Sequence, residues 1–209
     1  LRYFNVSKRK DITENGADFG FFPLDLDDKN SEDGINPKFN LTYQLDKDKL
    51  IYATAARGYR LGDINENLPS FCLEEVGEGG FPRFYESDYI WNYELGFKST
   101  WANNRIITNA AIFYNDWGNL QQYRFLDCGW GFTSNVGSAH SAGVELDVKA
   151  KLSKEFQVNL GLGLLDPTID EGGDFLDAEA GDNILYTPNL TANVSATYSK
   201  AISDQSNLY

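Results

Sequence analysis

Few residues in this chain carry side chains of the kind that catalyse reactions. His140 is the only histidine, and the chain lacks a G-x-S-x-G motif that would supply a nucleophilic serine. The two cysteines, Cys72 and Cys128, do not have the C-x-x-C spacing of a zinc or redox site. We therefore predict that the protein is not an enzyme and that it binds no metal or other cofactor as part of a catalytic site.

The cysteines instead raise the question of a disulfide. Both fall in long stretches without apolar periodicity, which indicates loops. In an oxidising compartment Cys72 and Cys128 could pair, and in a reducing one they would be free thiols. The sequence leaves both states open because it does not fix the distance between the two residues.

Acidic residues dominate the charge of the chain. The net charge is −13, from 18 Lys and Arg against 31 Asp and Glu. Nucleic acid is therefore excluded as a partner, because its phosphates require a basic surface. Segments 25–28 and 170–174 are rich in carboxylates, which Ca²⁺ prefers as ligands, but neither fits an EF-hand loop. We favour solvated anionic loops over calcium sites in these segments.

The elements that position these residues have the two-residue period of β-strands. Trp91, Tyr93, Leu95 and Phe97 alternate with polar residues, so they share one face of a strand. The same alternation, clean or partial, marks residues 38–45, 50–58, 91–101, 105–117, 144–152, 156–164 and 190–198. Most of these stretches have the length of about 9–11 residues that a tilted strand needs to cross a bilayer.

Short and long connections alternate between the patterned stretches. The short ones are polar turns at 46–49, 102–104 and 153–155, and the long ones span 8–34, 59–90, 118–134 and 166–187. A membrane barrel sorts its connections in this way, with short turns at one rim and long loops at the other. We therefore predict an all-β fold: an antiparallel transmembrane β-barrel segment of about ten strands.

Aromatic residues near the strand ends agree with this prediction. Trp91 and Trp101 lie at opposite ends of one strand, and Tyr43 and Tyr198 lie near the ends of two others. We predict that these four rings lie at the membrane interfaces, which Trp and Tyr prefer. The alternative is that they fill the core of a soluble sandwich. The mean hydropathy of −0.43 does not separate the two, because every second residue of a barrel strand is polar.

Three segments resemble one family of barrels, the TonB-dependent outer-membrane receptors. Residues 51–65 (IYATAARGYRLGDIN), 91–99 (WNYELGFKS) and 135–147 (NVGSAHSAGVELD) are similar to three strand motifs of that family, and they occur in the family's order. The resemblance implies that residues 1–209 are part of a barrel of about 22 strands, without its plug domain and closing strands. It also implies the outer membrane of a Gram-negative bacterium and uptake of a scarce ligand, such as a ferric siderophore or another iron chelate, energised by TonB through the plug.

Within that framework we predict two groups of site residues. The loop-end residues Arg60, Tyr85, Tyr123 and Trp130 are candidates for ligand contact, although they could equally pair with local acids or pack the loops together. The charged residues predicted to line the lumen are Glu94, Lys98, Glu145 and Lys149. The remaining functional alternatives are a passive porin-like channel and a soluble β-sandwich module that binds carbohydrate.

Overall fold

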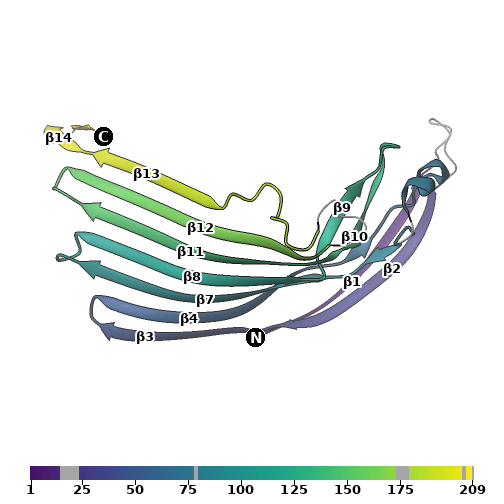
Figure 1. Ribbon diagram of the computed structural model, residues 1–209, viewed down its shortest axis with the longest axis horizontal. Helices are drawn as coiled ribbons and strands as arrows, with labels where there is room; N and C mark the ends of the chain where they lie inside the picture. Colours follow the sequence, from purple (N-terminus) through teal and green to yellow (C-terminus); the bar gives the residue numbers. More distant parts are fainter. Residues whose placement is uncertain (15–23, 78–79, 173–178, 204–205, 209) are drawn as a thin grey trace.

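The main sheet has seven antiparallel strands in the order β13-β12-β11-β8-β7-β4-β3 (Figure 1). The computed structural model describes residues 1–14, 24–77, 80–172, 179–203 and 206–208. The strands are β3 (Lys38–Asp46), β4 (Lys49–Arg60), β7 (Asp88–Trp101), β8 (Ile106–Gly118), β11 (Gly137–Lys151), β12 (Phe156–Gly172) and β13 (Leu190–Tyr198). Each coincides with one of the seven stretches of apolar alternation, so the predicted antiparallel strands are confirmed.

The two ends of the sheet differ as the connection lengths predict. Tight turns join β3 to β4, β7 to β8 and β11 to β12 at one end, which we call the turn end (Figure 1). The long connections gather at the opposite end, the loop end. They contain the short elements β5 (Asp63–Ile64), η2 (Ser70–Glu75), β6 (Phe84–Tyr85), β9 (Gln121–Phe125) and β10 (Gly131–Asn135). A last hairpin, β14 (Lys200–Ser203) and β15 (Ser206–Leu208), follows β13.

The predicted loop at 8–34 is wrong in part, because most of its described residues form a hairpin. β1 (Arg2–Glu14) pairs with β2 (Leu24–Asn36) in continuous antiparallel register. Within 8–34 this hairpin shows no apolar alternation, because the row of side chains that contacts the loops is itself polar there and includes Lys8, Lys10 and Glu32. β2 runs directly into β3 through Pro37, which lacks the N–H that would continue the pairing. β7 and β12 likewise extend into the predicted loops at 59–90 and 166–187.

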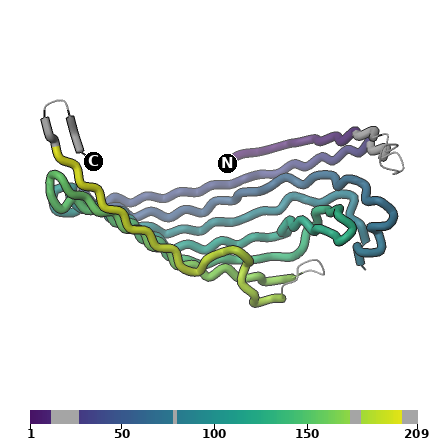
Figure 2. Tube along the Cα trace, turned by 90° about the horizontal axis from the view of Figure 1, so that it is seen from above, coloured from purple at the N-terminus to yellow at the C-terminus, as the bar shows by residue number. Residues whose placement is uncertain are grey.

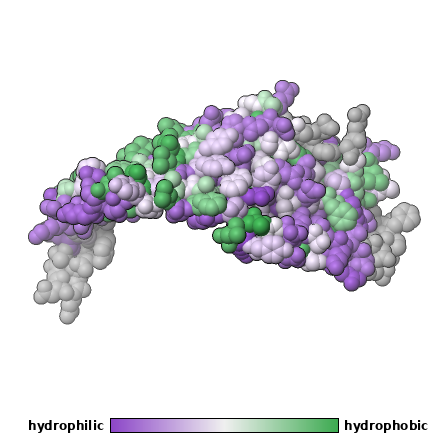
Figure 3. Space-filling view, turned by 90° about the horizontal axis from the view of Figure 1, so that it is seen from below, coloured by the Kyte–Doolittle hydropathy of each residue, from purple (hydrophilic) through white to green (hydrophobic). Residues whose placement is uncertain are grey.

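The sheet is a single curved layer, and its apolar side chains are exposed (Figures 1 and 2). Phe39, Leu41, Leu95 and Val194 are 66%, 73%, 52% and 72% exposed, respectively. We call the face that carries them the apolar face and the opposite one the polar face. Figure 3 shows hydrophobic side chains gathered on the surface between more hydrophilic zones. A soluble β-sandwich would bury such a row between two facing sheets, so the described residues contradict that alternative.

The buried core of the described residues lies at the loop end rather than in the sheet. It is a small cluster formed by Leu68, Cys72, Val76, Leu126 and Phe132. Phe81, Cys128 and Trp130 pack against this cluster. None of the helices among the described residues is both long and apolar enough to cross a membrane.

Candidate functional site

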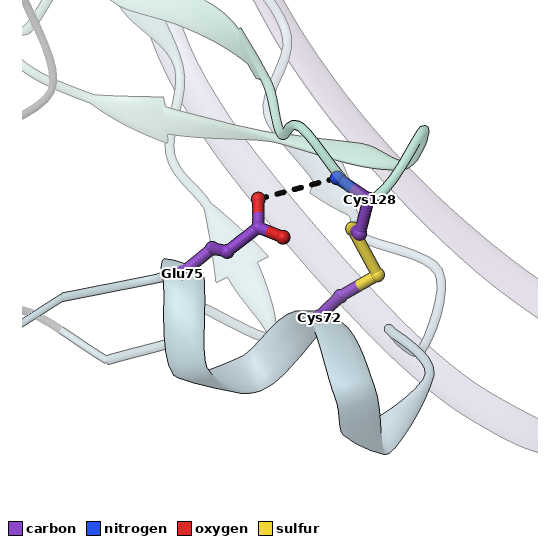
Figure 4. The surroundings of a disulfide bond; sticks show 3 residues. All are labelled: Cys72, Glu75 and Cys128. Carbon is purple, nitrogen blue, oxygen red and sulfur yellow. Dashed lines mark hydrogen bonds between the residues drawn. A yellow bond between two sulfur atoms is a disulfide. The ribbon is translucent and has the colours of Figure 1, made fainter.

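A disulfide joins two loops at the loop end. Cys72 in η2 is bonded to Cys128 in the turn between β9 and β10, with their Cα atoms 5.7 Å apart and a sequence separation of 56 (Figure 4). The Glu75 carboxylate accepts a hydrogen bond of 3.3 Å from the Cys128 N–H. A crosslink over a loop of this length stabilises a fold by about 4 kcal/mol in the chain-entropy model. The connections 61–87 and 119–136 are thereby held together, and we call them the loop assembly.

A buried asparagine forms a second link between the same two connections. The Asn65 side chain donates hydrogen bonds of 2.7 Å to the carbonyls of Pro82 and Thr133, and it accepts one of 2.9 Å from the Thr133 N–H. It satisfies both backbone groups of Thr133, as a neighbouring strand would. Asn65 is the last residue of the 51–65 motif, but the motif alone does not indicate which backbone groups its side chain binds.

The carboxylate of Asp88 anchors the loop assembly to the sheet. Its side chain is 2% exposed and is paired with Arg60. It also accepts hydrogen bonds from Trp117 Nε1 at 3.0 Å and from the Gln121 N–H at 3.3 Å. The Arg60 guanidinium lies 5.0 Å above the centroid of the Trp117 ring. Asp88 therefore receives donors from β4, from β8 and from the first residue of β9.

The β1–β2 hairpin is bound to the loop assembly by charged contacts. Lys8 Nζ lies 2.9 Å from the Asp63 carboxylate, and Lys10 Nζ lies 3.0 Å from that of Glu66. Glu32 accepts hydrogen bonds of 3.1 and 3.0 Å from the N–H groups of Gly62 and Ser87. Burial raises the pKa of the Asp63 carboxyl, but hydrogen bonds from Lys8 and from the Ile64 N–H outweigh burial and hold that pKa below its usual value.

The four predicted ligand-contact residues have different surroundings. Arg60 is bound to Asp88, and Trp130 packs against the buried cluster. Tyr85 is partly buried, and burial, aided by the charge of Asp63, raises its pKa. Tyr123 on β9 is 56% exposed, and its ring lies over Gly131 of β10. The exposed large hydrophobic residues of the loop assembly are Phe71, Leu73, Phe84, Tyr123 and Phe125.

The four predicted lumen residues lie on the polar face. Glu94 and Lys98 come from β7, and Glu145 and Lys149 come from β11. Glu94 accepts a hydrogen bond from the Tyr52 hydroxyl, and Lys98 Nζ lies 5.2 Å from the centroid of the Tyr52 ring. Within the described part of the chain, none of the four is in an ion pair. These charges are therefore available to a partner on that face.

One glycine allows the Tyr52 ring to lie against the sheet. Its cross-strand neighbour is Gly96, and a Cβ at that position would be only 2.2 Å from the ring carbons. A side chain at Gly96 would therefore displace the ring. The glycine in the W-x-Y-E-[LV]-G motif thus has a packing role in this chain.

The four predicted interface aromatics lie on the apolar face. Trp91 is at the loop end of β7 and stacks with Tyr93, with ring centroids 5.8 Å apart. Trp101, Tyr43 and Tyr198 lie toward the turn end and are exposed. The rings therefore mark the two ends of the apolar zone, as interfacial aromatics would.

The two carboxylate-rich segments lie partly outside the described residues. Asp27 pairs with Arg9, and Asp28 pairs with Arg83. Asp170 lies 2.6 Å from His140 Nδ1, whereas Asp174 and the side chain of Asp25 are not described. The described residues contain no group of three or more His, Cys, Asp or Glu side chains placed to hold a metal ion.

Comparison with known proteins identifies similar barrels. The family model described as "TonB dependent receptor-like, beta-barrel" matches residues 1–208. Among solved structures, the ferric yersiniabactin uptake receptor FyuA from Yersinia pestis superimposes with a TM-score of 0.67 at 19% identity, over 88% of this chain and 26% of that one. The siderophore receptor PiuA from Acinetobacter baumannii gives 0.64 at 16% identity, over 94% and 27%.

A third structure agrees with these two. The ferric-catecholate import receptor Fiu from E. coli K12 gives a TM-score of 0.66 at 20% identity, over 96% of this chain and 29% of that one. At these identities the likeness concerns the fold. The chain spans about a quarter of the length of the solved chains that it matches.

Proposed function

Because this chain belongs to the TonB-dependent receptor β-barrel family, we propose that residues 1–209 form part of the wall of an outer-membrane barrel that takes up a scarce ligand. One observation carries the proposal: the row of apolar side chains is exposed on one face of a single-layer sheet. Such a surface is costly in water and stable in hydrocarbon. The apolar face then contacts lipid, and the loop end faces the outside of a Gram-negative cell.

The polar face would line the lumen. Glu94, Lys98, Glu145 and Lys149 point to that side, and they lack ion-pair partners among the described residues. In the complete receptor these charges would meet a plug domain, through which TonB would supply energy. A water-filled lumen and a plug are both compatible with a polar inner face, which is why the passive porin-like channel is the competing function.

The loop assembly is our candidate for ligand capture. Tyr123, Phe125 and Phe71 are exposed on two connections that the disulfide and Asn65 hold together. A rigid platform of exposed rings binds a ligand with little loss of conformational entropy. The names of the similar structures, among them a ferric yersiniabactin and a ferric-catecholate receptor, favour a ferric siderophore as the ligand class.

A loop replacement tests this function in the complete receptor. The Asn65 N–H donates a 3.0 Å hydrogen bond to the Arg83 carbonyl, so a short Gly-Ser linker can replace residues 66–82 without moving the strands. Cys128→Ser accompanies the replacement to avoid a free thiol. We expect the variant barrel to insert but to take up no iron from a panel of ferric siderophores that the parent uses. Unchanged uptake would refute the loop assignment.

A strain without TonB separates the two transport functions. An energised receptor loses uptake in that strain, whereas a passive channel retains it. Retained uptake would replace our proposal with the porin-like alternative.

A further inference from the structure

The turn end carries a cationic stretch in an otherwise acidic chain. We call residues 102–106, 151–156 and 199–200, which connect or end neighbouring strands there, the cationic rim. Its four cations are all exposed, and they are Arg105, Lys151, Lys154 and Lys200. Glu155 is the only acid in these three segments, all of which the structure describes. The whole chain has a net charge of −13, so this local excess of cations runs against its composition.

Backbone hydrogen bonds hold the three segments of the rim side by side. The Lys151 N–H donates a bond of 2.7 Å to the Arg105 carbonyl, and the Ser199 N–H donates one of 2.7 Å to the Glu155 carbonyl. The segments therefore follow the order of β8, β11, β12 and β13 in the sheet (Figure 1). The cations of the rim lie at the turn end of four consecutive strands.

Arg105 is held in place and still has donors to offer. Its Nε and Nη2 donate hydrogen bonds of 3.2 and 2.6 Å to the carbonyls of Lys151 and Leu152. A guanidinium has five N–H donors, so others remain for a further acceptor. Leu152 is 56% exposed and continues the apolar row of β11, so the guanidinium lies at the border of the apolar face.

The turn between β3 and β4 shows what a balanced turn of this chain looks like. Lys49 Nζ lies 3.3 Å from the Asp46 carboxylate, and Lys47 Nζ lies 3.9 Å from that of Asp48. The two cations and two acids of residues 46–49 therefore neutralise each other. In contrast, no described ion pair involves a cation of the rim. The charge of the rim is thus left for a partner outside the described residues.

We propose that the cationic rim binds the headgroups of anionic phospholipids in the leaflet at the turn end. The exposed rings of Trp101 and Tyr198 place this end of the sheet at the depth of the headgroups. Phosphate oxygens then accept hydrogen bonds from Arg105, Lys154 and Lys200. This inference rests on the proposed function, because it requires the apolar face to lie in a bilayer.

The net charge of the rim selects the kind of phospholipid. Phosphatidylcholine has a phosphate too, but it also has an ammonium that the rim repels. Phosphatidylglycerol keeps the negative charge of its phosphate, so it complements the rim. Lys151 lies on the polar row of β11 and contributes to the local potential rather than to the contact.

Fluorescence quenching by lipids in the complete receptor tests this proposal. The receptor is reconstituted into dioleoyl phosphatidylcholine vesicles that contain a small fraction of a quencher lipid. The quencher is phosphatidylglycerol or phosphatidylcholine, each with a nitroxide on an acyl chain near the glycerol. One fluorophore is attached to Ala150→Cys, in the apolar row beside the rim, or to Ile51→Cys, beside the neutral turn. The native cysteines stay in their disulfide.

We expect the two label positions to differ. At Ala150, phosphatidylglycerol should quench about fivefold more strongly than phosphatidylcholine, the effect of about one favourable contact between a cation and an anionic surface. At Ile51 the two lipids should quench equally. In about 1 M NaCl the Debye length is about 3 Å, so the preference at Ala150 should disappear without any change to the rim.

Substitutions assign the preference to the rim. The triple variant Arg105→Gln, Lys154→Gln, Lys200→Gln should lose the preference for phosphatidylglycerol at the label beside the rim. Lys47→Gln removes a cation from the neutral turn and is the matched control, which should keep the preference at that label. Heat-modifiable electrophoretic mobility shows that each variant has inserted.

Four outcomes would overturn the proposal. They are equal quenching by both lipids at Ala150, equal preference at Ala150 and Ile51, a preference that resists salt, and a preference that survives in the triple variant. Failure of the proposed function looks different. In that case an inserted receptor labelled at Ala150 would be quenched by neither lipid, because the apolar face would not contact acyl chains. Equal quenching by the two lipids defeats this inference alone.

Discussion

The Asn65 side chain pairs with both backbone groups of Thr133, which lies 68 residues further along the chain. This pairing lets two connections of the barrel behave as one body. Asn65 is 7% exposed, so neither connection could leave the other without exposing or orphaning these groups. The disulfide also joins the two connections, and the Asp88 carboxylate binds them to the sheet.

Replacing Asn65 should loosen the loop assembly. In Asn65→Ala, the Thr133 N–H and carbonyl lose their partners, at a cost of about 1–3 kcal/mol for each buried group. We expect faster hydrogen exchange across residues 131–135 and unchanged exchange in β7 and β8. Asn159→Ala, on the polar face of β12, is the control. Identical exchange at 131–135 in the parent and in Asn65→Ala would contradict the role of this side chain.

Reduction of the disulfide should affect the loops and spare the sheet. The Cys72→Ser, Cys128→Ser double variant loses the crosslink, worth about 4 kcal/mol in the chain-entropy model. We expect trypsin to cleave it within 61–87 and 119–136 under conditions in which the oxidised parent resists. The barrel should keep its heat-modifiable mobility. Equal resistance to trypsin in the double variant and the oxidised parent would show that the buried cluster holds the loops together without the disulfide.

The role of Arg60 can be separated from ligand contact. Arg60→Gln removes the charge that neutralises the buried Asp88 carboxylate, so we expect a loss of about 1–3 kcal/mol in loop stability. Asp88→Asn in the same background should recover part of this loss, because the uncompensated charge disappears. Proteolysis without ligand is the measurement. Unchanged proteolysis in Arg60→Gln, combined with weaker ligand binding, would return Arg60 to the set of ligand-contact residues.

The contact between the hairpin and the loops should weaken in acid. The pKa of Asp63 is held below its ordinary value of 3.8 in the folded protein. The charged Asp63 carboxylate therefore stabilises the folded protein at pH values above its ordinary pKa. This stabilisation is lost as the pH falls through the lower pKa of the folded state. Because Lys8 and Asp63 are both about one-third exposed, we expect an effect below about 1 kcal/mol.

Hydrogen exchange in β1, followed from pH 6 to about pH 3 and corrected for the intrinsic rate, measures this dependence. Asp63→Asn should exchange faster at pH 6 and show less change with pH. A parent and variant with parallel pH profiles would mean that Asp63 does not link the hairpin to the loops.

The sequence predicts a strand where the two faces of that strand differ in polarity. Strands such as β7 have one apolar face and one polar face, so Trp91, Tyr93, Leu95 and Phe97 alternate with polar residues and the strand is predictable. Residues 8–34 are mostly polar, so the sequence predicts a loop there, although residues 8–14 and 24–34 belong to the β1–β2 hairpin. Periodicity reports a difference between two faces, and it cannot report a strand whose faces are alike.

The loop assembly depends on pairings that the sequence does not encode locally. The Arg60–Asp88 and Cys72–Cys128 pairs each join residues far apart in the chain, and only the fold fixes their distances. The predicted role of Arg60 in ligand contact had a structural alternative, a partnership with a local acid, and the structure supplies that partner. Exposed rings such as Tyr123 remain the predicted ligand contacts.

The most direct test of the central claim is solvent accessibility along β7. Spin labels are placed one at a time at positions 92–98 of the complete receptor in bilayers, with both native cysteines held in the disulfide. Accessibility to oxygen and to a water-soluble nickel complex is then recorded at each position. We predict that labels at Tyr93, Leu95 and Phe97 meet oxygen and exclude nickel, whereas labels at Asn92, Glu94 and Lys98 do not show this lipid signature. Loss of the two-residue alternation, or its reversal, would contradict the claim that the apolar face lies in lipid.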